Sequence, residues 1–215
     1  MDGNRRWAKE QGLPTLDGHQ RGFNNTFLEV VRFVRDEKIS HAVFYAFSTE
    51  NWKRTKEEVG YLMNLISESL SRMTEELEEH GVRVRIVGRR EDFSPQLQLQ
   101  MNELEDKSAV YTGTTIWIAL SYGGRAEIVE AVNEAVTKGQ VVDESSFEKL
   151  LWTADMPDPD MIVRTSGECR LSNFLTWKSV YSELYFIEKH WPALTKADLQ
   201  DILAEYAKRE RRQGA

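Results

Sequence analysis

Residues 1–7, Met-Asp-Gly-Asn-Arg-Arg-Trp, concentrate groups that bind a metal ion and phosphate in one short part of the 215-residue chain. A carboxylate such as Asp2 can hold Mg²⁺, Gly3 lets the backbone approach a diphosphate, and Arg6 can bind phosphate oxygens as a bidentate fork. The simpler interpretation is a solvated, disordered terminus, because chain ends usually fray. Composition alone favours that simpler interpretation.

A second polar segment, residues 48–54, reads Ser-Thr-Glu-Asn-Trp-Lys-Arg and lies between an apolar run and a long helical pattern. This position places hydroxyl, amide and guanidinium groups at the N-terminus of a helix, where an anion is favoured. Plain helix capping by Ser48 or Thr55 explains the same residues equally well. The segment by itself leaves both interpretations open.

A third polar segment, residues 164–173, holds two arginines, two serines and a glycine. Donors around a flexible glycine suit a phosphate cradle, and Glu168 could orient the arginines or contact a metal ion. A surface turn is the weaker alternative, because Arg164 ends a predicted buried strand. Residues 122–125, Tyr-Gly-Gly-Arg, favour a tight connection between a strand and a helix over another phosphate turn.

The elements that must position these segments alternate along the chain between helix and strand. Helical periodicity covers residues 23–34, 59–77, 95–110, a stretch after 123–124, and 144–153, and apolar β-rich runs cover 41–47, 82–88, 115–121 and 161–165. Buried strands that alternate with helices predict an α/β fold, with a mainly parallel central sheet flanked by helices. We expect one domain over residues 1–215. The polar segments at 48–54, 122–125 and 165–172 follow strands, so they should lie at the carboxyl ends, where such sheets bind ligands.

Composition excludes several classes of protein. A net charge of −7 argues against general nucleic-acid binding. The four histidines are far apart and the single cysteine, Cys169, has no partner at zinc-ligand spacing, which leaves a hard ion such as Mg²⁺ as the plausible metal. One cysteine also rules out an internal disulfide framework and fits a reducing compartment. No apolar run approaches the roughly 20 residues that span a bilayer, so we expect a soluble chain that could still rest on a membrane.

Taken together and in order, the motifs at residues 2–7, 18–19, 45–52, 122–125, 164–174 and 182–186 resemble the cis-prenyltransferase family, and most closely the bacterial undecaprenyl diphosphate synthases. The resemblance covers essentially the whole chain. Each motif is weak to moderate alone, but their order and spacing are specific. The chain also lacks an Asp-Asp-x-x-Asp pattern, with which the all-helical trans-prenyl synthases hold Mg²⁺.

The resemblance implies a Mg²⁺-dependent transferase that adds isopentenyl diphosphate repeatedly, in cis, to an allylic diphosphate such as farnesyl diphosphate. Asp2 would ligate Mg²⁺ and act in catalysis, with His19 and Asn51 assisting near the reacting centre, and Glu183 would contribute to a shared metal site. The remaining implied substrate-binding residues are Gly3, Asn4, Arg6, Trp7, Ser48, Trp52, Arg54, Arg164, Arg170, Ser172, Arg212 and Gly214. Of these, Arg164, Arg170 and Ser172 would hold isopentenyl diphosphate, and Arg212 and Gly214 would reach across a homodimer.

The resemblance also implies an apolar tunnel for the growing chain between the helix at 59–77 and the sheet, lined by Ala46, Leu62, Met63 and Ile66. Small Ala46 favours a long product, undecaprenyl diphosphate, whereas Tyr61 and Trp117 could block the tunnel and favour a shorter one. A non-catalytic accessory subunit of the same fold is a further alternative. The implied location is the cytoplasm, with peripheral contact to the inner face of the membrane for product release.

The chain departs from the family pattern at three places. The family carries a β-strand before the Asp-Gly-Asn motif, and we expect its absence here to leave neighbouring strand edges exposed. Arg5 replaces the commonest residue, glycine. Thr15 stands where the bacterial enzymes often have a phosphate-binding arginine.

Overall fold

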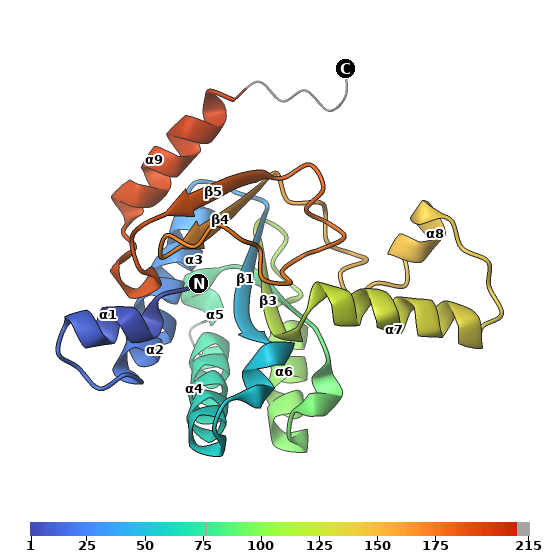
Figure 1. Ribbon diagram of the computed structural model, residues 1–215, viewed down its shortest axis with the longest axis horizontal. Coiled ribbons are helices and arrows are strands. Elements are labelled where there is room, and N and C mark those ends of the chain that lie inside the picture. Colours follow the sequence, from blue (N-terminus) through green and yellow to red (C-terminus); the bar gives the residue numbers. More distant parts are fainter. Residues whose placement is uncertain (76, 210–215) are drawn as a thin grey trace.

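The computed structural model describes residues 1–75 and 77–209, and its strands form two parallel sheets (Figure 1). Three strands, β1 (His41–Ser48), β3 (Thr115–Tyr122) and β2 (Arg83–Val87), pair in the order β1-β3-β2. Two more, β4 (Met161–Thr165) and β5 (Glu183–Ile187), form a separate pair. The helices of eight or more residues are α3 (Phe27–Asp36), α4 (Lys56–Glu75), α6 (Pro95–Ser108), α7 (Gly124–Thr137) and α9 (Lys196–Ala207).

The main core lies between the three-stranded sheet and helices α3, α4 and α6. Strand β3 is central and apolar, and seven of its eight residues are buried, as expected for a strand covered on both faces. On the helix-facing side of the sheet, the ring of Phe44 in β1 contacts the ring of Phe27 in α3 edge-on, with ring centroids 4.6 Å apart. The predicted α/β class, the parallel pairing and the flanking helices are therefore confirmed.

The opposite face of this sheet carries a second apolar cluster, around Trp117, Tyr122, Met156 and Leu175. Side chains alternate across a strand, so Trp117 points away from α4 and donates from Nε1 to His41 at 3.1 Å. The expectation that Trp117 could block a tunnel beside α4 was wrong for this reason. Helices α7 and α8 (Glu144–Glu148) project from the body and share a third small cluster (Figure 1).

The sheet is divided where the sequence predicted one continuous sheet. Among the described residues, β1 pairs only with β3 and β4 only with β5, so a free edge of each faces a cavity between the two sheets. The predicted helix over 144–153 is shorter than expected, ending at Glu148, and the sequence did not predict β5 or α9.

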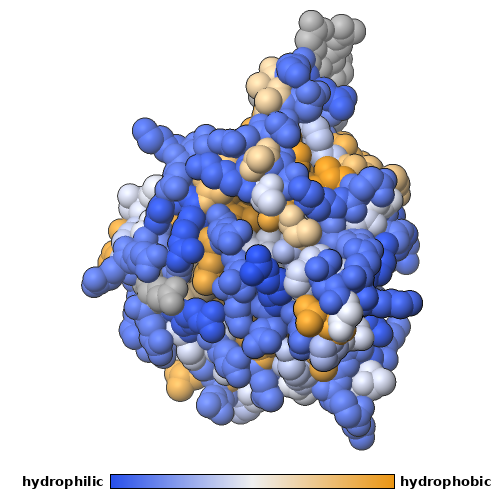
Figure 2. Space-filling view, turned by 90° about the vertical axis from the view of Figure 1, so that its left-hand side faces the viewer, coloured by the Kyte–Doolittle hydropathy of each residue, from blue (hydrophilic) through white to orange (hydrophobic). Residues whose placement is uncertain are grey.

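Helix α9 packs near α3 and projects above the β4–β5 sheet (Figure 1). The molecular face that carries α9 is mostly hydrophilic, with hydrophobic residues visible below the projecting helix (Figure 2). Among the described residues, no helix is both long and apolar enough to cross a membrane.

Candidate active site

The N-terminal turn is ordered, because three backbone hydrogen bonds hold it against segments from the other end of the chain. The Asp2 amide donates to Thr165 Oγ1 at 2.8 Å, and the Asp2 carbonyl accepts from Thr165 Oγ1 at 2.8 Å and from the Trp191 amide at 2.9 Å. Helix α1 (Asn4–Glu10) starts directly after this turn. The prediction of a disordered terminus, which composition had favoured, was therefore wrong.

The Asp2 carboxylate lies among donors and positive charges. It accepts from the Gly3 amide at 2.7 Å and from Arg164 at 2.9 Å, and Arg6 lies 3.6 Å away. Burial raises the pKa of Asp2, but the hydrogen bonds from Arg164 and Gly3 and the charges of both arginines outweigh it, so this pKa lies below its ordinary value. Asp2 is therefore ionised at neutral pH, as a ligand of a hard cation must be.

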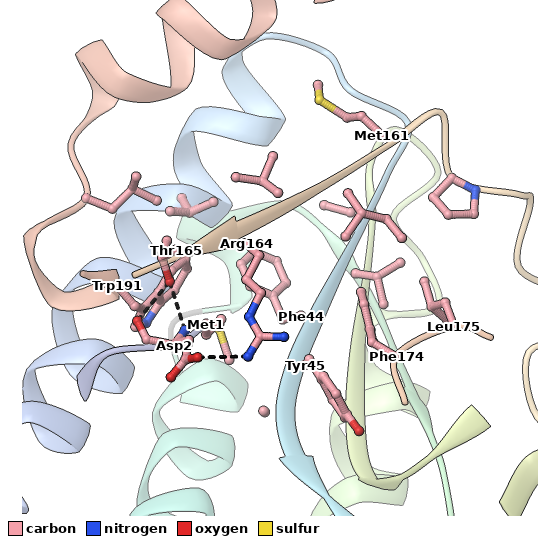
Figure 3. A pocket seen from close by; sticks show the side chains of 18 of the residues that line it. Met1, Asp2, Phe44, Tyr45, Met161, Arg164, Thr165, Phe174, Leu175 and Trp191 are labelled. Atoms are coloured by element: carbon pink, nitrogen blue, oxygen red, sulfur yellow. Dashed lines mark hydrogen bonds and ion pairs between the residues drawn. The ribbon is translucent and has the colours of Figure 1, made fainter. Parts of the chain in front are cut away.

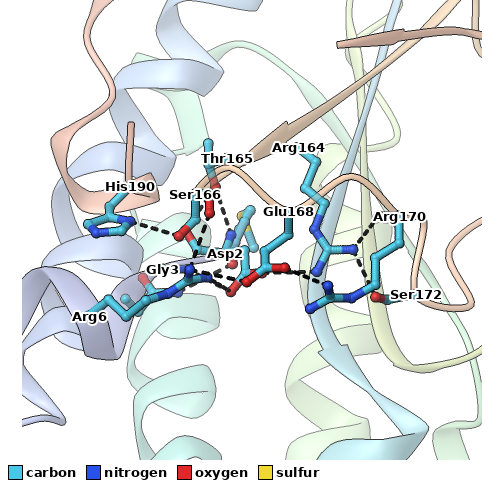
Figure 4. Close-up of polar contacts among 12 residues, drawn as sticks. Asp2, Gly3, Arg6, Arg164, Thr165, Ser166, Glu168, Arg170, Ser172 and His190 are labelled. Carbon is cyan, nitrogen blue, oxygen red and sulfur yellow. Dashed lines mark hydrogen bonds and ion pairs between the residues drawn. The ribbon is translucent and has the colours of Figure 1, made fainter. Parts of the chain in front are cut away.

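The segment after β4 gathers its arginines around this carboxylate (Figure 4). Arg164 donates from one nitrogen to Asp2, and from another to Ser172 Oγ at 2.8 Å and to the Arg170 carbonyl. Glu168 accepts from Arg170 at 2.5 Å and from Arg6 at 3.2 Å. The four implied residues Asp2, Arg6, Arg164 and Arg170 are thus joined through one network, and Glu168 orients the arginines as expected.

His19 lies on the short helix α2 (Asp17–Arg21), which packs tightly against α1. A Cβ at Gly18 would lie 1.9 Å from the Asn4 carbonyl oxygen, so only glycine permits this approach. The side chain of His19 is buried, and its Nε2 atom has no hydrogen-bond partner. Burial first, and then the charge of Arg54, lowers the pKa of His19 to about 4. The imidazole is therefore neutral at pH 7.

Asn51 lies in a short 3₁₀ helix, Thr49–Lys53, that follows β1. Its Oδ1 accepts from the Ser48 amide at 3.0 Å, which leaves the amide NH₂ group as the part offered to a ligand. Trp52 is anchored elsewhere, donating from Nε1 to Ser121 at 2.8 Å. Arg54 is paired with Glu58 at 2.8 Å. Capping and ligand binding, which the sequence left as alternatives, are therefore compatible in this segment.

A cavity of about 1590 Å³ joins these groups, and it exceeds the roughly 300–1,000 Å³ of ordinary small-molecule pockets (Figure 3). Its polar end contains most of the implied residues: Asp2, Gly3, Asn4, Arg6, His19, Ser48, Asn51, Arg54, Arg164, Arg170 and Ser172. Two buried donors or acceptors at this end, Arg164 Nε and His19 Nε2, have no hydrogen-bond partner within residues 1–75 and 77–209. Such unpaired polar atoms indicate a site for a polar, anionic ligand.

The rest of the cavity wall is apolar. It includes Val34 of α3, Phe44 and Ala46 of β1, Leu62 of α4 and Leu203 of α9. Of the four residues expected to line a tunnel, Ala46 and Leu62 border this cavity, whereas Met63 and Ile66 pack in the main core. Tyr61 does not line the cavity, and neither do Trp7 and Trp52.

Glu183 does not join Asp2 in this chain. Glu183 is the first residue of β5 and pairs with Met161, the first residue of β4. Asp2 instead contacts Thr165, at the other end of β4. Met161 and Thr165 are four residues apart, which is about 13 Å along a strand. The Glu183 carboxylate lies 3.6 Å from Arg209. Among the described residues, no group of three or more acidic, histidine or cysteine side chains could hold a metal. Arg212 and Gly214 lie outside the described residues.

Sequence reasoning missed several residues that hold the site together. Thr165 fixes Asp2, and Asn173 links three segments, because it donates to Glu50 at 2.8 Å and accepts from the Arg125 amide at 2.8 Å. The Gly124 amide also donates to the Asn173 carbonyl at 2.8 Å, which supports the tight-connection interpretation of residues 122–125. Both residues lie inside the polar segment 164–173, but nothing in the sequence assigned a role to either of them.

Known proteins resemble this chain along its whole length. A family model described as "Putative undecaprenyl diphosphate synthase" matches residues 1–214. An isoprenyl transferase of Thermotoga maritima is 46% identical over all of this chain and 94% of its own length. The Micrococcus luteus protein named ditrans,polycis-undecaprenyl-diphosphate synthase ((2E,6E)-farnesyl-diphosphate specific) is 41% identical, over all of this chain and 88% of its own.

Solved structures share the fold. Lavandulyl diphosphate synthase from Lavandula x intermedia, in complex with dimethylallyl diphosphate, superposes with a TM-score of 0.93 at 33% identity and covers 100% of this chain and 95% of its own. A probable undecaprenyl diphosphate synthase from Campylobacter jejuni gives a TM-score of 0.83 at 31% identity, over 90% of this chain and 92% of its own.

Proposed function

This chain belongs to the undecaprenyl diphosphate synthase family and is a cis-prenyltransferase, and from that premise we propose that it extends farnesyl diphosphate with isopentenyl diphosphate to undecaprenyl diphosphate. The farnesyl-specific Micrococcus luteus relative supports this choice of primer and product. A short- or medium-chain cis-prenyl product is the second candidate. The structural similarity to lavandulyl diphosphate synthase supports this second candidate.

One observation supports the proposal above the others: a single cavity has arginines at one end and apolar walls elsewhere. A prenyl diphosphate has the same division, with a dianionic head and a hydrocarbon tail. Arginine forks bind phosphate oxygens in pairs. Arg164 has a buried Nε–H without a protein partner, which suits a phosphate oxygen.

The chemistry follows from this arrangement. Arginines at the polar end stabilise the negative charge that develops on the departing diphosphate as the allylic C–O bond breaks. The allylic carbon then bonds to the terminal carbon of the isopentenyl double bond, and loss of one proton restores a double bond. Apolar walls exclude water, which would otherwise capture the allylic cation. The departing diphosphate is a candidate to accept the proton.

Each anionic group has its own set of side chains in this proposal. Arg164, Arg170 and Ser172 hold isopentenyl diphosphate, while residues of the Asp2 turn, with Asn4 and Arg6, hold the allylic diphosphate. Asn51 serves as a donor, because its amide oxygen already accepts from Ser48. Neutral His19 borders the same end of the cavity.

We propose Mg²⁺ as the cofactor, held by Asp2. The structure offers one ionised carboxylate beside a phosphate-binding network, which fits the way Mg²⁺ uses one or two carboxylates, substrate phosphates and water. When bound, the ion would neutralise diphosphate charge. The position of Glu183 gives no support to a second ligand from the same chain.

We also propose a homodimer. Helix α7 exposes Val129, Val132 and Val136, which lie at i, i+3 and i+7 on one side of a helix that projects from the body. Contiguous exposed apolar residues mark interaction sites. Light scattering of the purified protein should give twice the chain mass, and Val132→Lys should give the single-chain mass.

We further propose that the protein works in the cytoplasm, peripheral to the inner face of the membrane, and that its product serves as a cell-wall lipid carrier. Support comes from the chemistry of a long hydrocarbon product, which partitions into a bilayer after release, and from the bacterial relatives.

The decisive experiment is incubation of the purified protein with labelled isopentenyl diphosphate, farnesyl diphosphate and Mg²⁺, followed by mass analysis of the extracted lipids. We expect a ladder that ends at 55 carbons and disappears when Mg²⁺ is chelated. A ladder that ends at a shorter length would change the proposed product but would still support the proposed reaction. No product from a folded protein would favour a non-catalytic accessory subunit.

A further inference from the structure

Ser166 and His190 lie beside the Asp2 turn (Figure 4), and Glu10 extends this pair to a hydrogen-bonded series of three polar side chains. Ser166 Oγ lies 2.7 Å from His190 Nδ1, and His190 Nε2 lies 2.9 Å from a carboxylate oxygen of Glu10. A carboxylate only accepts, so Nε2 carries a proton, and in the neutral imidazole Nδ1 accepts from the Ser166 hydroxyl. Three segments far apart in sequence are therefore joined by two hydrogen bonds.

This arrangement has the residue types of a hydrolytic triad, but the described geometry does not suit nucleophilic catalysis. Ser166 is buried, and it does not line the cavity. The amides that could stabilise an oxyanion are already engaged, since Ser166 N donates to Lys189 O and Gly167 N to Ile187 O, each at 2.9 Å. The serine is therefore placed to hold structure.

Gly3 packs directly on the Ser166–His190 hydrogen bond. A Cβ on Gly3 would lie 2.5 Å from His190 Nδ1 and 2.6 Å from Ser166 Oγ, and Gly3 has a left-handed φ of 92°. The neighbouring residue is Asp2, whose carboxylate accepts from the Gly3 amide. The position of the serine–histidine pair thus determines where the Asp2 turn can lie.

Contacts with Thr165, Trp191 and His190 hold helix α1 at both ends. Asp2 is bonded to Thr165 and to the residue after His190, whereas Glu10, the last residue of α1, is bonded to His190 itself. Between these two anchors the helix carries Asn4 and Arg6 toward the cavity. A change at His190 would therefore loosen the diphosphate-binding face of α1 without touching the cavity wall.

We propose that His190 is a positioning residue for the diphosphate site, acting through Ser166 and Gly3 on the Asp2 turn, with Glu10 fixing the tautomer of its imidazole. This inference rests on the proposed function. It predicts that His190 controls the affinity for a diphosphate although it does not contact the ligand.

Two substitutions separate the hydrogen bond from packing. His190→Phe keeps the ring volume and removes both bonds, whereas His190→Asn places an amide oxygen near the Nδ1 position, where it can accept from Ser166. Calorimetry with inorganic diphosphate and Mg²⁺, at a temperature where each variant is folded, measures the affinity. We expect His190→Phe to weaken binding about tenfold, as for loss of the hydrogen bond to Ser166, and His190→Asn, which lacks only the bond to Glu10, to restore most of it.

Steady-state kinetics gives a second measurement. The KM for the allylic diphosphate should rise in parallel with the dissociation constant, and Ser166→Ala should reproduce the effect if His190→Phe fails to fold. Glu103→Gln, which breaks an exposed ion pair with Lys107 on α6, is the matched control and should change neither quantity.

The outcomes distinguish this inference from the proposed function. If the wild-type protein neither binds diphosphate nor forms product, the proposed function fails. If the wild-type protein does both and His190→Phe binds as tightly as it does, the positioning role is overturned. Equal losses in His190→Phe and His190→Asn would also overturn it, because the hydrogen bond to Ser166 would then be irrelevant.

Discussion

The carboxylate of Asp2 and the guanidinium of Arg164 lie 2.9 Å apart although 162 residues separate them in sequence. Each compensates the charge of the other, and Arg164 also donates to Ser172. In the proposed function, a diphosphate would share Arg164 with Asp2, and Mg²⁺ would share Asp2 with Arg164.

Asp2→Asn should reduce turnover by about 10³-fold, since it removes the charge that holds the cation but keeps an acceptor for the Gly3 amide. The carboxylate is partly exposed, so the melting temperature should change little. Product formation over a range of Mg²⁺ concentrations checks this. Asp36→Asn, at an exposed pair with Arg35, is the control, and full activity in Asp2→Asn would refute the assignment.

Gly3→Ala should lower both stability and diphosphate affinity. A side chain at a φ of 92° costs about 1–2 kcal/mol, and its Cβ would also displace His190 and Ser166. Chemical denaturation measures the first effect and calorimetry the second. Gly139→Ala is a useful comparison, because Gly139 has a φ of 62° but nothing lies within 4 Å of its Cβ position. Equal effects of the two changes would contradict the close-contact argument.

His19 should make stability depend on pH between about 4 and 6.5. Burial lowers its pKa to about 4 in the folded protein, from 6.5 in the unfolded chain. The unfolded state therefore binds more protons in this window, so stability is full above pH 6.5 and is lost as pH falls toward 4. The loss is about 3 kcal/mol.

The measurement for His19 is the free energy of unfolding of the wild-type protein and His19→Gln at several pH values. The difference between the two proteins should shrink as the pH falls below 6.5. A difference that stays constant from pH 7 to pH 4.5 would show that His19 titrates normally.

Glu127→Ala should destabilise the protein by about 2–4 kcal/mol. Glu127 is fully buried and accepts from the Tyr122 hydroxyl at 2.5 Å and from the Thr153 amide and hydroxyl at 2.9 and 2.7 Å. Its removal leaves buried donors unpaired. Thermal denaturation checks this, with Glu134→Ala at an exposed pair with Lys138 as the control, expected within about 0.5 kcal/mol of wild type.

Ala46→Leu should shorten the product. Ala46 borders the cavity beside Leu62, and the added carbons would occupy space that the growing chain needs. Mass analysis of the lipid ladder should give a shorter final length with little change in the first addition. Val110→Leu, at an exposed position after α6, should leave the ladder unaltered. An unchanged ladder in Ala46→Leu would show that the growing prenyl chain does not pass Ala46.

Local patterns predicted most individual elements well. The strand over 161–165 coincides with β4. The helical stripe at 23–34 covers most of the π-helical turn Gly22–Thr26 and most of α3, and the stripe at 59–77 covers most of α4 and reaches Leu77, the first residue of α5 (Leu77–His80). Periodicity works here because each element buries one continuous apolar stripe or run. The sequence did not predict β5, although Leu184–Ile187 form an apolar run, because the run is only four residues long; none of the β5 residues is fully buried.

The sequence by itself determined the chemistry available to this protein: which segments carry arginines, hydroxyls and a carboxylate, and that the segments at 48–54 and 165–172 follow strands of a parallel sheet. Only the tertiary structure decided which of them meet. It brought Asp2 to Arg164 and His190 to Ser166, and it kept Glu183 at the far end of β4 and β5. Local periodicity reports burial within a segment, whereas these contacts depend on how segments 24 residues apart (Ser166 and His190) or 162 residues apart (Asp2 and Arg164) are placed by packing around a shared core.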